Sequence, residues 1–413
     1  MSLVARTIAR PAVARVCLAL LGILALVLLA QTWRRAHRVD GNDFTSYLLA
    51  AQAIAAAHPL DAIRTPFPYI YPLFLAFALV PLTVLPYGVS VVLWFALNAS
   101  SLVLSFILLE RWRSAPDTLP ADATRHGAPA PAALATGAGA LPLATIVGLV
   151  FIDVIQNDLL NGQVNLLVLG ACVLALHALL AGRDTGASAS WAVASAIKLV
   201  PLALTPFFIR RRAWRTLIAG LCLAALLCVL PAIVMGVEPM MDWYAAYVRS
   251  FIAPSLIDSA DVALDFSIYG MLASMAPALH AVPAGRLVTA LACLAAIALI
   301  DGRRAVSRQA TLSVFSLSLL AIPLVSPKSE THHLVFAIPA ACLLASTSLH
   351  DRSSGARVRR ALLIAAAALY WVGHQVDPMK SVAWFTGLVI LAGLTIAQAG
   401  RVRDGADRHP ERV

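Results

Sequence analysis

Stretches of about 20 apolar residues recur along the whole chain, and short polar segments separate them. A helix needs about 20 mostly apolar residues to cross the hydrocarbon core of a bilayer. Of the 413 residues, 60% are apolar and only 13% are charged, whereas roughly one-quarter of the residues in a soluble domain are charged. We therefore predict a single all-α polytopic membrane domain with about ten full crossings.

The six cysteines all lie inside apolar stretches, without CxxC spacing and without histidines at metal-ligand spacing. They are predicted to be small packing residues. We expect neither a metal site nor a cofactor. These cysteines are Cys17, Cys172, Cys222, Cys228, Cys293 and Cys342.

The basic residues indicate which ends of the spans face the cytoplasm. When the loops alternate between the two sides, 22 of the 31 Lys and Arg residues fall on one side, as the positive-inside rule requires. The excess of Arg therefore reflects topology, and we expect no nucleic-acid partner. With the Ala- and Arg-rich composition, this favours a bacterial inner membrane protein. The cytoplasmic segments are the N-terminus, 111–126, 183, 210–215, 303–308, 350–360 and the tail at 400–413.

Polar segments and prolines divide the chain further. Residues 16–30 are predicted to be a retained first span, because an interfacial stop at 31–35 follows instead of an A-x-A-like cleavage site. The outer loop 33–71 includes an amphipathic stretch, Asp43–Ala57, that is consistent with a helix at the membrane interface. Pro81 and Pro86 interrupt the next apolar run, so we expect 72–85 to be embedded without crossing and 87–110 to cross.

Residues 114–140 are predicted to form a flexible cytoplasmic loop, and 237–283 a large outer segment. Basic residues flank 187–210 at both ends, which favours a hairpin broken at Pro201 over one ordinary span. The other predicted spans lie near 141–155, 164–181, 213–235, 284–300, 309–325, 333–349, 361–376 and 381–399.

Polar groups at membrane depth are costly and therefore indicate functional sites. Asp43 opens the amphipathic helix of the first outer loop, where it can be an N-cap or a general base for an acceptor hydroxyl. The turn from Asn157 to Asn165 can be purely structural. Alternatively, the amides of Gln163 and Asn165 can bind sugar hydroxyls.

Two further clusters carry positive or titratable groups. Lys198 lies near the tip of the proposed hairpin, and twelve residues at a rise of about 1.5 Å place it about 18 Å from the inner surface. It can bind a lipid phosphate, or it can snorkel or pair with a structural carboxylate. The adjacent His332 and His333 do not favour a two-histidine metal site, but one of them can contact a phosphate or shuttle a proton while its neighbour packs.

These clusters, in this order and spacing, resemble glycosyltransferase family 87 of the C-type membrane glycosyltransferase superfamily. The resemblance covers roughly 43–336. Two departures are Leu73, where members often have a second proline, and Glu330-Thr331, where an aromatic residue often precedes the histidines. The matching positions are Asp43-Phe44 with Tyr47, Tyr69–Pro72, Gly162–Leu167, Ala196–Leu199 with Pro201, and Ser326-Pro327 with His332-His333.

The resemblance implies a polyprenyl-phosphate sugar donor, best known as mannose, and a glycolipid or glycan acceptor. It implies that Asp43 is the catalytic base at the outer face, and that Lys198, His332 or His333, with an arginine such as Arg64, stabilises the departing phosphate. Tyr47, Tyr71, Gln163 and Asn165 are then expected to bind sugar or acceptor. Transfer to an acceptor hydroxyl would proceed with inversion.

Three alternatives remain open from the sequence. A transporter or lipid flippase also suits many spans and a buried lysine, but the chain shows no second broken helix to pair with the hairpin. A non-catalytic membrane scaffold is disfavoured by the concentration of polar residues on one face. Within the enzyme class, the donor sugar can be glucose or a pentose.

Overall fold

The computed structural model describes residues 11–58, 67–114, 140–257, 267–276, 278, 285–300, 308–326, 329–350, 354–375 and 380–408. Within these ranges the chain forms helices and no strands, which confirms the all-α prediction. Arg64 lies outside the described residues. The expected loop at 114–140 also lies outside them, except for its two end residues.

Five helical stretches in these ranges are long and apolar enough to cross a membrane, and a bent pair of helices can make a sixth. The protein is therefore a helical membrane protein, whereas the total of about ten crossings remains a prediction. The five stretches are formed by α2 (Pro11–Ala36), α5 (Tyr87–Ser114), α11 (Trp214–Val229) with α12 (Ala232–Met235), α17 (Arg308–Val325), and η6 (Thr331–Ala337) with α18 (Ile338–His350).

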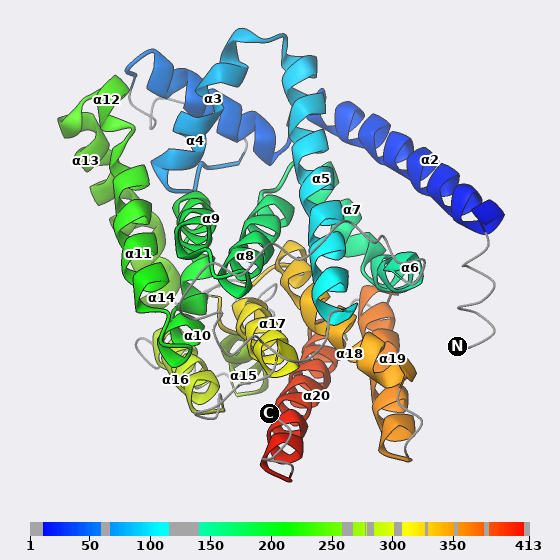
Figure 1. Ribbon diagram of the computed structural model, residues 1–413. Helices are drawn as coiled ribbons and strands as arrows, with labels where there is room; N and C mark the ends of the chain where they lie inside the picture. The colour runs from blue at the N-terminus through cyan, green and yellow to red at the C-terminus, as the bar shows by residue number, and fades with distance from the viewer. Residues whose placement is uncertain are drawn as a thin grey trace.

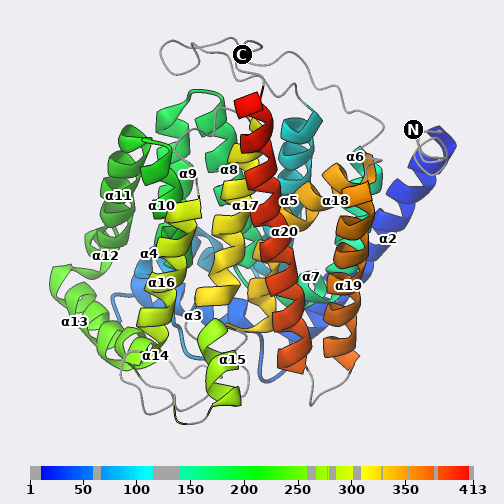
Figure 2. The same ribbon diagram turned by 90° about the horizontal axis from the view of Figure 1, so that it is seen from below.

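The long helices run side by side, and shorter elements cover one end of the bundle (Figure 1, Figure 2). Figure 2 shows α3, α13, α14 and α15 at this end, and the last turns of α20 at the opposite end. The remaining elements are α3 (Asp43–Ala55), α4 (Leu73–Leu79), η2 (Val80–Val84), α6 (Ala140–Val150), α7 (Ile152–Leu160), α8 (Asn165–Leu180), α9 (Asp184–Ile197), η3 (Val200–Leu204), α10 (Thr205–Arg210), α13 (Val237–Tyr247), η4 (Val248–Ile252), α14 (Ala253–Ile257), α15 (Ile268–Met275), α16 (Gly285–Ile300), α19 (Ser354–Gln375) and α20 (Lys380–Arg408).

The expected span at 141–155 is not one helix. α6 ends at Val150, Phe151 leaves the helical conformation, and α7 then meets α8 at an angle of 114°. A straight helix would carry the polar residues of α7, such as Asp158, through the apolar interior. The bend instead brings them to the covered end of the bundle, beside α3.

The segment 187–210 folds back on itself, as the hairpin interpretation predicts. α9 ends at Ile197, and η3 and α10 follow as separate short pieces. The Thr216 hydroxyl in α11 donates to the Asp184 carboxylate at 3.1 Å, so the chain has returned to the level at which α9 began. The break lies at Lys198, whose backbone is extended, three residues before Pro201.

Candidate active site

The N-terminus of α3 presents Asp43 without using it as a cap. Asn42 is the N-cap, and its side-chain oxygen accepts a hydrogen bond from the Thr45 backbone amide at 3.3 Å. The N-cap role considered for Asp43 is therefore wrong, because Asn42 already satisfies the free amide. The Asp43 carboxylate is left available for other partners. Most of α3 is buried against α4 and η2, so it lies within the protein more than on its surface.

The backbone of the turn between α7 and α8 lies close enough to the start of α3 to hydrogen-bond with it. The Asp43 amide donates to the Asn161 carbonyl at 2.9 Å, and the Asn42 side chain donates to the Leu160 carbonyl at 3.2 Å. Gly162 has a positive φ of 65°, and a Cβ atom there would lie 2.8 Å from the Phe44 Cβ. Only glycine fits this conformation and this approach without strain.

This approach places Gln163 between Asp43 and Tyr71. The Gln163 amide nitrogen donates to the Asp43 carboxylate at 2.6 Å, and its carbonyl accepts from the Tyr71 hydroxyl at 3.1 Å. The Tyr47 ring lies edge-on to the Tyr71 ring, 5.0 Å away. Its buried hydroxyl lies beside that of Tyr71 but has no hydrogen-bond partner of good geometry among the described residues.

Burial raises the pKa of Asp43 to about 6, and the negative charge of Glu330 acts in the same direction. Lys198, the hydrogen bond from Gln163 and the charge of Arg35 oppose this rise in pKa. A carboxylate with this pKa is largely ionised at neutral pH, yet it binds a proton more readily than an exposed aspartate. These properties suit a general base.

Lys198 also lies near Tyr71. Its ammonium or amine nitrogen, Nζ, is 5.6 Å from the centre of the Tyr71 ring. Nζ also contacts the Asn165 side-chain oxygen and the His333 Nε2 atom, each at 2.8 Å. Lys198 can point inward because the helical hydrogen bonding stops there, between α9 and η3.

Asp158 is a site residue absent from the sequence-based set. It is fully buried and accepts hydrogen bonds from the Asn165 side chain at 2.8 Å and the Leu166 amide at 3.4 Å. It thereby orients Asn165 toward Lys198. The available signal was its position as the one carboxylate in the polar turn from Asn157 to Asn165.

The two histidines have different surroundings. His333 contacts Lys198, and its Nδ1 accepts a hydrogen bond from the Glu330 amide at 3.2 Å. His332 is also buried, with its Nδ1 3.7 Å from the Glu330 carboxylate. Within the described ranges no group of three or more His, Cys, Asp or Glu residues could hold a metal ion.

The structure thus gathers residues from five separated parts of the sequence around Tyr71. A base and a potentially cationic nitrogen lie near this ring, an arrangement that can remove a proton from one group and stabilise negative charge on another. Of the expected site residues, the structure brings together Asp43, Tyr47, Tyr71, Gln163, Asn165, Lys198, His332 and His333.

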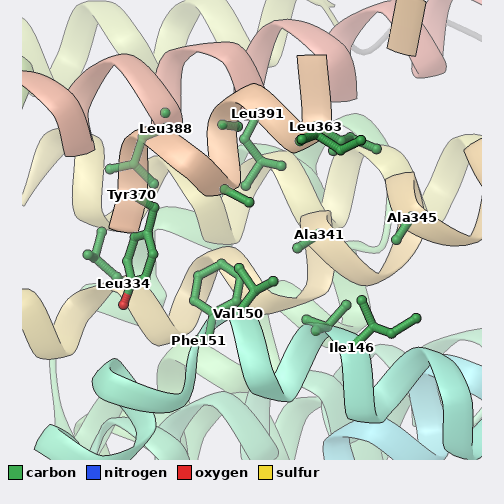
Figure 3. Close-up of a pocket in the computed structure, with 15 residues that line it drawn as sticks. Ile146, Val150, Phe151, Leu334, Ala341, Ala345, Leu363, Tyr370, Leu388 and Leu391 are labelled. Atoms are coloured by element: carbon green, nitrogen blue, oxygen red, sulfur yellow. The ribbon is translucent and has the colours of Figure 1, made fainter. Parts of the chain in front are cut away.

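An apolar cavity of about 210 Å³ is lined by α6, α18, α19 and α20, together with Leu334 of η6. Leu334, which follows His333 directly, lines it and is buried, whereas Ile146 and Ile364 in its wall are 44% and 69% exposed. Figure 3 places Leu334 and Tyr370 toward one end and Ile146 and Ala345 toward the other. The cavity therefore extends from the neighbourhood of the site to exposed apolar helix faces.

Comparison with known proteins gives one family match. A model of glycosyltransferase family 87 matches residues 69–327, which is more than half of the chain. The matched range includes Tyr71, Gln163, Asn165 and Lys198, whereas Asp43 and the histidine pair lie outside it. No curated protein and no solved structure matches the chain.

Proposed function

The chain belongs to glycosyltransferase family 87 and is a membrane glycosyltransferase. On that premise we propose that it transfers a hexose, in the first instance mannose, from a polyprenyl-phosphate sugar to a glycolipid or glycan acceptor. The reaction takes place at the outer face of the membrane and inverts the anomeric configuration.

The observation that carries this proposal is the gathering of Asp43 and Lys198 near Tyr71: Gln163 bonds to both Asp43 and Tyr71, and Lys198 Nζ lies 5.6 Å from the centre of the Tyr71 ring. Asp43 removes the proton from the acceptor hydroxyl as its oxygen attacks the anomeric carbon. The bond from that carbon to the phosphate oxygen breaks, and the lipid phosphate leaves with the electron pair. Lys198, supported by His333, stabilises the negative charge on the phosphate.

The apolar cavity supports a lipid-linked donor over a water-soluble one. Its wall reaches exposed side chains on α6 and α19, and one lining residue is adjacent to His333. An isoprenoid chain that extends from a phosphate at Lys198 would find apolar surface there. The basic side chain of Arg35 influences Asp43 and is available at that end of the site.

The test is transfer of radiolabelled mannose from synthetic polyprenyl-phosphate mannose to membrane glycolipids by the purified protein. We expect transfer by the wild type and a loss of about 100- to 10,000-fold in Asp43→Asn, the range supplied by a general base. Asp40→Asn is the matched control, because Asp40 is an exposed carboxylate only three residues away. It should retain full activity.

Donors carrying glucose or a pentose, and a nucleotide-linked mannose, are assayed in parallel. Transfer only from the nucleotide-linked sugar would refute the lipid donor. Full activity in Asp43→Asn would exclude Asp43 as the base, whatever the donor.

A further inference from the structure

The hydrogen bonds around Lys198 have directions that their partners fix. An ionised Asp158 carboxylate has no hydrogen to donate and can only accept a hydrogen bond. The Asn165 side-chain nitrogen therefore points at Asp158 and donates to it. The Asn165 oxygen therefore points at Lys198 and accepts a hydrogen bond from Nζ at 2.8 Å. One hydrogen of Nζ is thus assigned.

His333 fixes the other contact of Nζ. Its Nδ1 accepts from the Glu330 backbone amide, which can only donate. His333 is therefore neutral with its hydrogen on Nε2, the nitrogen that lies 2.8 Å from Nζ. An ammonium group has no lone pair and cannot accept this hydrogen, whereas a neutral amine can.

From these directions we infer that Lys198 is a neutral amine while the site is empty, and that binding of the anionic donor adds one proton to it. The inference rests on the proposed lipid-phosphate donor. Asp158, Asn165 and His333 are then positioning residues, which hold the amine in place and keep its lone pair occupied.

The charged groups around Lys198 come from several elements. Three carboxylates influence it, Asp43 from α3, Asp158 from α7 and Glu330 from the start of η6, and the two histidines of η6 lie nearby. The carboxylates favour an ammonium group. However, the hydrogen-bond partners of Nζ among the described residues are Asn165 and His333, and neither is negatively charged.

The proton balance is simple. A sugar–phosphate–lipid diester carries one negative charge and does not titrate near neutral pH. When its phosphate replaces the His333 contact, Nζ takes one proton from solvent and becomes an ammonium that pairs with the phosphate. The empty site thus avoids a cation without a paired anion, and the charge is formed only when the donor arrives.

Isothermal titration calorimetry measures this uptake directly. Farnesyl-phosphate mannose is titrated without acceptor into the full-length Asp43→Asn protein at pH 8.5, in Tris and in Bicine. Asp43→Asn prevents turnover and removes the carboxylate proposed as the base from the groups that could take up the proton. We expect more than about half a proton taken up per donor, whereas an ordinary lysine with a pKa of about 10.4 would take up almost none.

Two further substitutions in the same background identify the group that is protonated. Lys198→Arg keeps a permanent cation, so uptake should vanish while binding persists. His333→Gln offers an oxygen that accepts from an ammonium group, so uptake should also vanish although the lysine is retained.

Uptake that persists in Lys198→Arg would overturn the inference, because the proton would then go to another group, such as Asp158 or a histidine. Binding without uptake in the Asp43→Asn parent would overturn it as well, and would leave the proposed donor intact. Absence of any binding heat would instead overturn the proposed donor, and this inference with it.

Discussion

Asp43 is subject to opposing effects that set its acidity. Burial and the charge of Glu330 favour the protonated form, while the hydrogen bond from Gln163 and the charge of Arg35 favour the carboxylate, as does Lys198 when it is an ammonium. The result is a pKa of about 6. The group is therefore ionised at neutral pH but is protonated at a pH where an ordinary aspartate remains charged.

We expect the transfer rate to depend on pH through this group. As the base, Asp43 is active only when ionised, so kcat/KM should fall tenfold per unit below about pH 6. The pH profile of mannose transfer at low donor concentration measures this limb. A limb centred near pH 4 would contradict the buried environment of Asp43.

Gln163→Leu provides the contrast within the same measurement. It removes a hydrogen bond that stabilises the carboxylate, so the acidic limb should move to higher pH in addition to any loss of rate. A merely structural role for Gln163 would lower the rate and leave the position of the limb unchanged.

The sequence pointed to most of the candidate site residues because polar side chains are rare in an apolar chain and stand out. It could not predict their pairings. Gln163 bonds to Asp43 across 120 residues, and Lys198 to His333 across 135. Asp158 was overlooked because a carboxylate in a turn looks structural until the fold shows that it orients Asn165.

At the scale of elements, the turn from α7 to α8 determines whether the site can form. Its backbone approaches α3 at Gly162, the Trp94 indole donates to the Gly162 carbonyl at 2.9 Å, and the Trp94 ring stacks on Phe44. The next residue is Gln163. A shift of the turn would therefore move Gln163 away from Asp43.

Gly162→Ala should disturb both stability and activity. A side chain at φ 65° is strained, and its Cβ would clash with Phe44, so we expect a loss of about 2 kcal/mol in the free energy of unfolding and a clear loss of transfer. Gly148→Ala is the matched control. It lies in α6 with nothing within 4 Å of an added Cβ, so it should be neutral or stabilise the protein by roughly 0.5–1 kcal/mol.

Thermal unfolding in detergent and the mannose transfer assay compare the two variants. Equal behaviour of Gly162→Ala and Gly148→Ala would show that the close approach of the turn to α3 is not required. Helix positions were predicted from the long apolar runs and the proline breaks. The 114° bend between α7 and α8 was not, because it depends on contacts with α3 that are distant in sequence.

At the scale of the whole molecule, the bundle has two chemically different ends. Figure 2 shows α3, which begins at Asp43, at the end opposite to the last turns of α20. The basic residues predict that the α20 end faces the cytoplasm. With that orientation, the base faces the outer side of the membrane.

Labelling of single cysteines tests this orientation. In a background without the six native cysteines, Asp40→Cys and Thr185→Cys introduce thiols at exposed positions. Asp40 lies three residues before the base, and Thr185 opens α9 beside Arg183, on the predicted cytoplasmic side. A membrane-impermeant maleimide added to intact spheroplasts should label Asp40→Cys, and should label Thr185→Cys only after lysis.

The reverse pattern would place the carboxylate inside the cell and would contradict a reaction at the outer face. It would leave the glycosyltransferase family unchanged, because charge distribution sets the orientation whereas the site geometry follows from helix packing.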